Sequence, residues 1–205
     1  MAEAASKTLV ILLHGVGSSG SSLAPLSSRL AALLPGAILA APDAPEASGF
    51  GSGRQWFSVA GITDESRPAR IAAARPGFNA TLAGIIEENG LTGRLDRVAL
   101  VGFSQGTIMS LDAVASGRWP VGAVVGFSGR LASPQPLTPR GSTPILLVHG
   151  TDDAVIPVQE TERAAAGLSA LGLPVETRFE PGLGHTISGA GASHAGAFLA
   201  RIFGR

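Results

Sequence analysis

The feature that most constrains the fold is a regular alternation of two kinds of segment along the 205 residues. Short apolar runs rich in Val, Ile and Leu, bounded by turn residues, predict strands buried on both faces. Longer segments with apolar positions at helical spacing lie between them. The expected strands are 9–13, 37–41, 97–101, 123–127, 145–148 and 175–179, and the expected helices are 23–34, 67–89, 105–116, 158–171 and 193–203. This order predicts right-handed crossovers and an α/β fold, a doubly wound, mostly parallel sheet with helices on both faces.

Composition and charge narrow the class of protein. Hydrophobic residues make up 45% of the chain and no linker-like stretch interrupts it, so one domain with a sizeable core is expected over 1–205. The basic residues are scattered and the formal net charge is zero, which predicts a small-molecule partner and no nucleic acid. The absence of cysteine excludes disulfides, thiolate metal sites and a cysteine nucleophile.

The first residues carry no sign of export or of membrane insertion. Segment 1–7 has one acid and one base and lacks a basic leader region, and the apolar run that follows is too short to span a bilayer. We therefore expect a cytoplasmic protein without stable membrane insertion. A homodimer is compatible with the same composition.

Polar residues follow four of the expected strands, in segments 14–17, 102–106, 149–153 and 182–185. In parallel α/β sheets the reactive groups gather at the carboxyl ends of the strands, so chemistry is expected there. The segment 42–68 is rich in Gly, Pro and Ser without a sustained period, which predicts a long loop able to wall a pocket.

One of these segments, Gly102-Phe103-Ser104-Gln105-Gly106, has the G-x-S-x-G pattern of a nucleophile turn between a strand and a helix. Glycines flank the serine in such turns because side chains there would collide with neighbouring backbone. Ser104 is therefore the expected nucleophile, and a plain Gly-Ser turn is the alternative. Similar segments at 126–130 and 191–195 fail at the fifth position, so Ser128 is expected to line the site rather than to attack.

A serine nucleophile needs a base within hydrogen-bond reach and an acid that orients the base. In enzymes built on such a sheet the chain order is Ser, acid, His. The sequence supplies Asp152 and Asp153, between which spacing alone does not decide, and then His185 in a glycine-bracketed loop. His194 is the alternative base, but it falls in the last expected helix, where a solvated histidine is the simpler interpretation.

A tetrahedral intermediate also needs two backbone N–H donors, usually one directly after the serine and one in an earlier strand-end loop. Gln105 and Val16 fit these positions. Glycines on both sides of Val16 let the main chain approach a substrate closely. His14 and His149 are expected to be hydrogen-bonded structural histidines.

Taken together, these segments resemble the phospholipase/carboxylesterase family of α/β-hydrolases, which includes acyl-protein thioesterases and small bacterial carboxylesterases. The resembling motifs are LLHGVGSSG (12–20), APDAP (41–45), QWF (55–57), GFSQG (102–106), VHGTDDAVIP (148–157) and GLGH (182–185). The resemblance runs nearly end to end and implies an α/β-hydrolase fold that works without metal or other cofactor. It implies that Asp153, four positions after the histidine of H-G-x-x-D, is the acid. It likewise implies Val16 as an oxyanion donor, and Trp56 with its neighbour Phe57 as substrate-binding aromatics.

Two features depart from the family pattern. Thr107 stands where relatives commonly have a third glycine, and we expect it to narrow or polarise the space behind the nucleophile. The first expected strand begins close to residue 1, so the sheet edge is expected to be trimmed compared with many relatives.

The expected function is that of a serine carboxylesterase that hydrolyses short to medium acyl esters through an acyl-enzyme. Three alternatives remain. An acyl-protein thioesterase or lysophospholipase would use the same triad; a lactone hydrolase of the dienelactone type is disfavoured because that group uses cysteine; and a non-enzymatic ligand-binding member of the fold would use no triad. The loop 42–68 supplies Phe50, Trp56, Phe57 and Ile62, but its many small residues favour a modest pocket.

Overall fold

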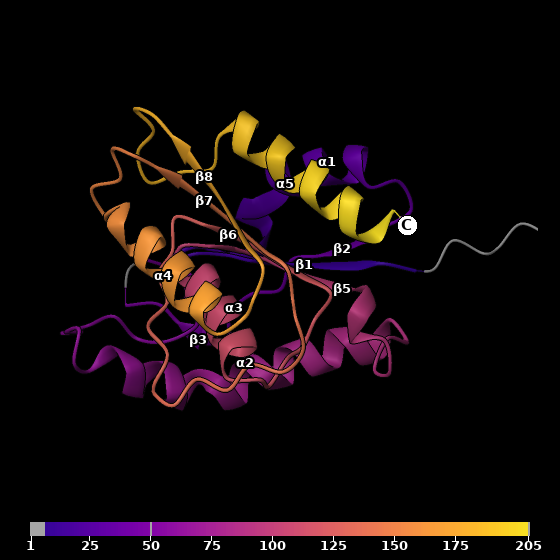
Figure 1. The fold of residues 1–205 in the computed structure, drawn as a ribbon. Coiled ribbons are helices and arrows are strands. Elements are labelled where there is room, and N and C mark those ends of the chain that lie inside the picture. Colours follow the sequence, from indigo (N-terminus) through magenta and orange to yellow (C-terminus); the bar gives the residue numbers. More distant parts are fainter. Residues whose placement is uncertain (1–6, 50, 205) are drawn as a thin grey trace, which may run out of the picture.

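A computed structural model describes residues 7–49 and 51–204 of the chain. At its centre lies a six-stranded sheet in the order β2-β1-β5-β6-β7-β8, in which every neighbouring pair of strands is parallel (Figure 1). The strands are β1 (Leu9–Leu13), β2 (Ile38–Ala40), β5 (Val98–Phe103), β6 (Ala123–Phe127), β7 (Ile145–Gly150) and β8 (Val175–Glu180).

Helices cover both faces of this sheet (Figure 1). One face carries α1 (Ala24–Leu33) and α5 (Gly189–Phe203), and the other carries α2 (Arg67–Glu88), α3 (Gln105–Ala115) and α4 (Gln159–Ala170). Short 3₁₀ turns, η1 (Gly20–Leu23) and η2 (Leu95–Arg97), precede α1 and β5. The doubly wound α/β architecture predicted from the alternation of segments is confirmed.

Strand β1 explains why the apolar runs are continuous. Leu9, Ile11 and Leu13 are fully buried in the core beneath α2, α3 and α4. Val10 and Leu12 are fully buried in the core beneath α1 and α5. Successive side chains of a strand point to opposite faces, so a strand covered on both sides needs apolar residues at every position.

The N-terminal side of the sheet ends at β2, and no strand precedes β1 within residues 7–49. The expectation of no targeting segment falls largely on residues 1–6, which lie outside the described residues, as does Phe50 of the expected pocket loop. No helix in the described part of the chain has both the length and the apolar character needed to cross a membrane.

Most element boundaries lie within one or two residues of the sequence expectation, and the end of β5 and the start of α5 are the differences that bear on the site. Strand β5 continues to Phe103 and so ends directly at the expected nucleophile. Helix α5 begins at Gly189 rather than at 193, because the Ser188 hydroxyl caps it by accepting a hydrogen bond from the Gly191 amide (2.8 Å). The glycines in this first turn have low helix propensity, which concealed the start of the helix from sequence periodicity.

The segment 42–68 is more ordered than the expected loop. It contains a two-stranded antiparallel ribbon of β3 (Glu46–Ala47) and β4 (Arg54–Gln55). The Gly17 amide donates to the Arg54 carbonyl (2.9 Å), which ties the ribbon to the loop after β1. Strands of two residues are too short to give a detectable period, so the sequence could not predict them.

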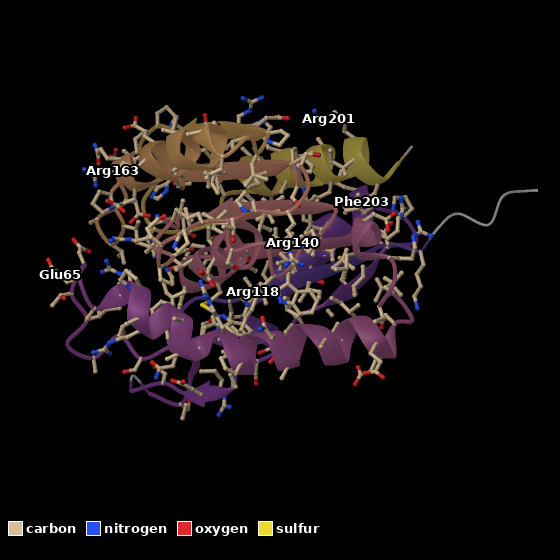
Figure 2. The ribbon with its side chains drawn as sticks, turned by 60° about the horizontal axis from the view of Figure 1, so that its bottom comes forward. Glu65, Arg118, Arg140, Arg163, Arg201 and Phe203 are labelled. Atoms are coloured by element: carbon tan, nitrogen blue, oxygen red, sulfur yellow. The ribbon has the colours of Figure 1, made fainter. Side chains whose placement is uncertain are left out.

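Charged side chains occur in two settings. Arg163 and Arg201 lie at separate places on the outside of the molecule (Figure 2), in keeping with the scattered charge of the sequence. Asp112 of α3 is fully buried, and it pairs with Arg75 of α2 (2.8 Å) and with Arg118 (2.5 Å). Loss of either arginine would leave part of a buried charge uncompensated, so this cluster holds α2 against α3.

Candidate active site

Ser104 occupies a sharp turn between β5 and α3. Its backbone has φ 52° and ψ −113°, a conformation that residues other than glycine rarely adopt. A Cβ at Gly106 would lie 2.0 Å from the carbonyl oxygen of Leu13, and a Cβ at Gly102 would lie 2.4 Å from the Gly106 carbonyl carbon. Backbone contacts therefore require both glycines, and the turn holds the Ser104 hydroxyl at the carboxyl edge of the sheet.

Three side chains from three strand ends meet at this edge. Ser104 follows β5, Asp153 follows β7 and His185 follows β8. His185 Nε2 lies 3.0 Å from Ser104 Oγ, and His185 Nδ1 lies 2.6 Å from Asp153 Oδ2. Because a carboxylate only accepts, Nδ1 carries the proton and Nε2 presents its lone pair to the serine hydroxyl.

Close backbone contacts turn the loop after β8 back toward the nucleophile. The Asp152 amide donates to the Leu183 carbonyl (3.0 Å). A Cβ at Gly150 would lie 2.1 Å from the same carbonyl oxygen, so only glycine permits the loops after β7 and β8 to touch there. This contact lets His185 reach Ser104 across the end of β6.

Asp153 uses both carboxylate oxygens. Oδ2 accepts from His185, and Oδ1 accepts from the amides of Val155 (2.8 Å) and Ile156 (2.9 Å). Burial by itself raises the pKa of Asp153, but the hydrogen bonds from His185 and the two amides outweigh burial and hold that pKa below its ordinary value. The carboxylate is therefore charged at neutral pH and able to orient the imidazole.

Two backbone amides beside the nucleophile are unpaired. The N–H groups of Val16 and Gln105 form no hydrogen bond with another described residue. Gln105 directly follows Ser104, and a Cβ at Gly15, next to Val16, would lie 3.3 Å from the Ser104 Cβ. Unpaired N–H donors at a nucleophile are the groups that can hold an oxyanion. Their catalytic role stays a prediction.

The side chain of Gln105 anchors the aromatic pair. Its Oε1 accepts from the Trp56 amide (2.7 Å) and its Nε2 donates to the Phe57 carbonyl (2.7 Å). Trp56 and Phe57 are only 1% and 3% exposed, and the Trp56 ring meets Phe78 of α2 edge-on with centroids 5.3 Å apart. Both rings lie in the core rather than on an open pocket wall, where the sequence interpretation put them, because large rings gain most from full burial. Direct substrate contact by either ring stays a prediction.

The residues considered as rivals lie elsewhere. Ser128 is 1% exposed and its hydroxyl has no partner in the described structure. His194 is exposed on α5, and the exposed Asp152 accepts a hydrogen bond from the Thr151 hydroxyl (2.9 Å). None of these three side chains takes part in the hydrogen bonds that link Ser104, His185 and Asp153. The described residues hold no group of three or more His, Asp or Glu side chains placed to bind a metal ion.

Comparison with known proteins identifies the family. The family model described as phospholipase/carboxylesterase matches residues 1–202. The chain belongs to the phospholipase/carboxylesterase family. This confirms the resemblance and the α/β-hydrolase fold inferred from the motifs, and it makes the chain a member of a family of ester hydrolases.

Individual relatives of this phospholipase/carboxylesterase chain carry related names. Esterase YpfH of Escherichia coli (strain K12) is 36% identical over 179 residues, which cover 87% of this chain and 76% of that protein. Acyl-protein thioesterase 1 of Gibberella zeae is 31% identical over 111 residues, which cover 51% and 47%. The crystal structure of esterase PE8 superimposes with a TM-score of 0.88 at 35% identity and covers 97% of this chain and 94% of that chain.

Thr107, the departure from the phospholipase/carboxylesterase pattern, fills a space that two glycines leave open. A Cβ at Gly129 would lie 2.3 Å from Thr107 Cγ2, and a Cβ at Gly126 would lie 2.5 Å from it. The Thr107 hydroxyl lies 2.8 Å from the carbonyl oxygens of Gly102 and Phe127 and is placed to donate to either. The side chain therefore narrows the space behind the nucleophile turn, and the turn after β6 accommodates it through its glycines.

One histidine is nearer to the chemistry than the sequence indicated. His149 Nε2 lies 2.8 Å from the Ile156 carbonyl oxygen and 3.1 Å from Asp153 Oδ2, and Nδ1 lies 2.6 Å from Thr161 Oγ1. The carbonyl oxygen only accepts, so Nε2 carries a proton, and the Thr161 hydroxyl also lies 3.4 Å from the Gly129 carbonyl oxygen. His149 is hydrogen-bonded as expected, and it also contacts the carboxylate oxygen that orients His185. Its place at the end of β7, four residues before Asp153, is the sequence signal for this contact.

His14 has no such contact. Its Nε2 accepts from the Ala44 amide (3.0 Å), so Nδ1 donates to the Gly15 carbonyl (2.7 Å). Burial lowers the pKa of His14, which keeps the ring neutral. The carbonyl of His14 accepts from Trp56 Nε1 (3.0 Å). These bonds join the loop after β1 to the segment 42–68, so the role of His14 is structural.

Proposed function

We propose that this protein is a serine carboxylesterase that hydrolyses short to medium acyl esters through an acyl-enzyme intermediate. The observation that carries the proposal is the hydrogen-bonded series from Ser104 Oγ to His185 (3.0 Å) and from His185 to Asp153 (2.6 Å). Membership of the family and the names of YpfH and PE8 support it. We take the chain 1–205 as one domain that acts on a small-molecule ester in the cytoplasm, and a homodimer is compatible with this.

The chemistry follows from the roles that these groups can take. Ser104 Oγ bonds to the ester carbonyl carbon while His185 Nε2 takes the hydroxyl proton, and the amides of Val16 and Gln105 hold the oxyanion. The bond from that carbon to the alcohol oxygen then breaks, and His185 gives the proton to the departing alcohol. Water attacks the acyl-enzyme with His185 as base, and release of the acid restores Ser104. Asp153 keeps the neutral imidazole in the required tautomer and stabilises the imidazolium that forms when His185 takes the proton.

Thioesters are the second candidate substrate, because one relative is named acyl-protein thioesterase 1. A thiol leaving group would pass through the same steps, as would a lysophospholipid ester. A rate profile across p-nitrophenyl esters from acetyl to palmitoyl, with one acyl thioester of matched chain length, distinguishes these substrates. Highest kcat/KM on acetyl to octanoyl oxygen esters supports the carboxylesterase, whereas higher kcat/KM on the thioester or on palmitoyl esters supports the second candidate.

The experiment combines active-site labelling with turnover of p-nitrophenyl acetate. We expect a fluorophosphonate probe to label the wild type on Ser104, as located by peptide mass spectrometry. His185→Ala should lower kcat by about 10⁴-fold or more, and the matched variant His194→Ala should stay within about twofold, since a surface substitution leaves the site intact. Labelling elsewhere would reject Ser104 as the nucleophile. Absence of labelling and turnover in a folded wild type would support the non-enzymatic alternative.

A further inference from the structure

A groove that the mechanism has not used lies beside the site. It has a volume of about 430 Å³ and lies between the η1–α1 segment and the start of α5, and we name it the α1–α5 groove. Its apolar wall is formed by Leu23, Leu26, Phe103, Ile187 and Ala192. This volume is in the range of about 300–1,000 Å³ that is usual for sites that bind small organic groups.

Chain neighbours of the reacting groups line the groove. Phe103 directly precedes Ser104, and the Phe103 ring centroid lies 4.9 Å from that of His185. Gly15 also lines the groove, and a Cβ there would lie 3.3 Å from the Ser104 Cβ. Thr186, another lining residue, directly follows His185. The groove therefore adjoins both the nucleophile turn and the loop that carries the base.

The lining disfavours cationic ligands. Among the described residues of the groove, the one charged side chain is Arg29, whose guanidinium donates to the Ser193 hydroxyl (2.7 Å). Ser18 and Ser22 add hydroxyls that bond to each other (2.6 Å). A cationic group would meet the like charge of Arg29 without a lining carboxylate to compensate it. An uncharged, apolar group fits the wall best.

We propose that the α1–α5 groove binds the alcohol part of the ester, and that it selects apolar, uncharged alcohols. This inference rests on the proposed function. When Ser104 Oγ bonds to the carbonyl carbon, the bond from that carbon to the alcohol oxygen must break, and His185 Nε2 delivers the serine proton to that oxygen. The alcohol part therefore lies on the His185 side of the carbonyl carbon. Thr186 and Ile187, which continue the chain from His185, form the groove on that side.

The test fills the groove from its rim and compares two series of esters. Ser22→Trp replaces an exposed lining residue, and Ser28→Trp is the matched control, an exposed serine on α1 outside the lining. The substrates are methyl acetate, hexyl acetate and methyl hexanoate, which separate a long alcohol from a long acyl group. We expect Ser22→Trp to lower kcat/KM for hexyl acetate by about tenfold or more, in the range that pocket fit controls. The two methyl esters should stay within about twofold, and Ser28→Trp should change none of the three.

A second variant, Ile187→Ala, tests the proposal even if Ser22→Trp does not fold. Ile187→Ala widens the groove, so the ratio of kcat/KM for cyclohexyl acetate to that for methyl acetate should rise by about threefold or more. Circular dichroism and fluorophosphonate labelling verify that each variant is folded. A loss on methyl hexanoate instead of hexyl acetate would assign the groove to the acyl group and overturn the proposal, as would equal effects on all three esters. Failure of the wild type to hydrolyse any ester would reject the proposed function itself.

Discussion

The tripeptide Gly-Phe-Ser occurs twice in this chain, at 102–104 and at 126–128, in two nearly identical settings. The two copies lie at the ends of neighbouring parallel strands, where Gly102 pairs with Gly126 and Phe103 with Phe127. Ser104 and Ser128 are the two non-glycine residues with positive φ in the described structure, at 52° and 47°. Each serine amide donates to a carbonyl of the next strand, Ser104 to Phe127 (2.9 Å) and Ser128 to Val148 (3.0 Å).

The two turns differ in what comes to meet the hydroxyl. Ser104 Oγ lies 3.0 Å from His185 Nε2, whereas Ser128 Oγ is buried without a partner in the described structure. Ser104 also leads into α3, while no helix follows Ser128 before β7. A strained serine turn at a strand end is thus a local product of the chain. The two serines differ because His185, in the loop after β8, contacts Ser104 and not Ser128.

Removing each serine hydroxyl in turn tests whether the two turns differ in function. Ser104→Ala should lower kcat on p-nitrophenyl acetate by about 10⁴ to 10⁶-fold, because the nucleophile itself is lost. Ser128→Ala removes an unpaired hydroxyl and should leave kcat within about threefold. Steady-state kinetics on both purified variants measure the difference. Comparable losses in the two variants would mean that Ser128 takes part in the chemistry and that the turns are not functionally distinct.

The next largest effect should come from the acid that aims His185 at Ser104. Asp153→Asn keeps the shape but removes the charge that fixes the imidazole tautomer, so kcat should fall by roughly 10³ to 10⁴-fold. Asp152→Asn, the adjacent control, should cost less than about tenfold, because Asp152 is exposed and its side chain accepts a hydrogen bond from Thr151. The kcat values for p-nitrophenyl acetate decide between them. The reverse order would move the acid assignment to Asp152 while leaving Ser104 and His185 in place.

The smallest expected effect is on stability and comes from the packing of Thr107 against Gly129. Gly129→Ala places a Cβ against Thr107, at 2.3 Å from its Cγ2 in the present geometry, and should lower the free energy of unfolding by about 1–3 kcal/mol. In a Thr107→Gly background the same substitution should cost less, because the methyl group is gone. Urea unfolding of the two single variants and the double variant gives the coupling energy. Equal losses in both backgrounds would show that Thr107 does not set the glycine requirement after β6.

The fold and much of the site geometry could be anticipated from the sequence. Continuous apolar runs predicted two-sided strands, and the G-x-S-x-G spacing predicted a turn in which Gly102 and Gly106 touch backbone. The pairing of Asp153 with His185 was an implication of family resemblance, because the spacing of two adjacent acids is silent about which one faces the base. The start of α5 was misjudged because its Ser188 cap precedes glycines that periodicity does not register as helix.

Other features depended on contacts between distant segments. The burial of Trp56 requires α2 and the side chain of Gln105, 49 residues away, and no property of the tripeptide QWF distinguishes a core ring from a pocket ring. The contact of His149 with Asp153 joins residues that are close in the sequence, but it requires the bend after β7 that brings the His149 ring to the carboxylate oxygen that also contacts His185. Such contacts arise from chain reversal, and residue type reports only that a polar side chain needs a partner.

The sequence therefore specifies the strands, their order along the chain and the glycines that allow the strained turn at Ser104. The tertiary structure shows how the base reaches the serine that the G-x-S-x-G pattern had singled out. Ser104 and His185 are 81 residues apart, and their 3.0 Å contact exists because the sheet order places β8 three strands from β5 and the loops after β7 and β8 touch at Gly150. The physical reason is that backbone conformation is set by near neighbours, whereas the approach of two side chains is set by the packing of every strand between them.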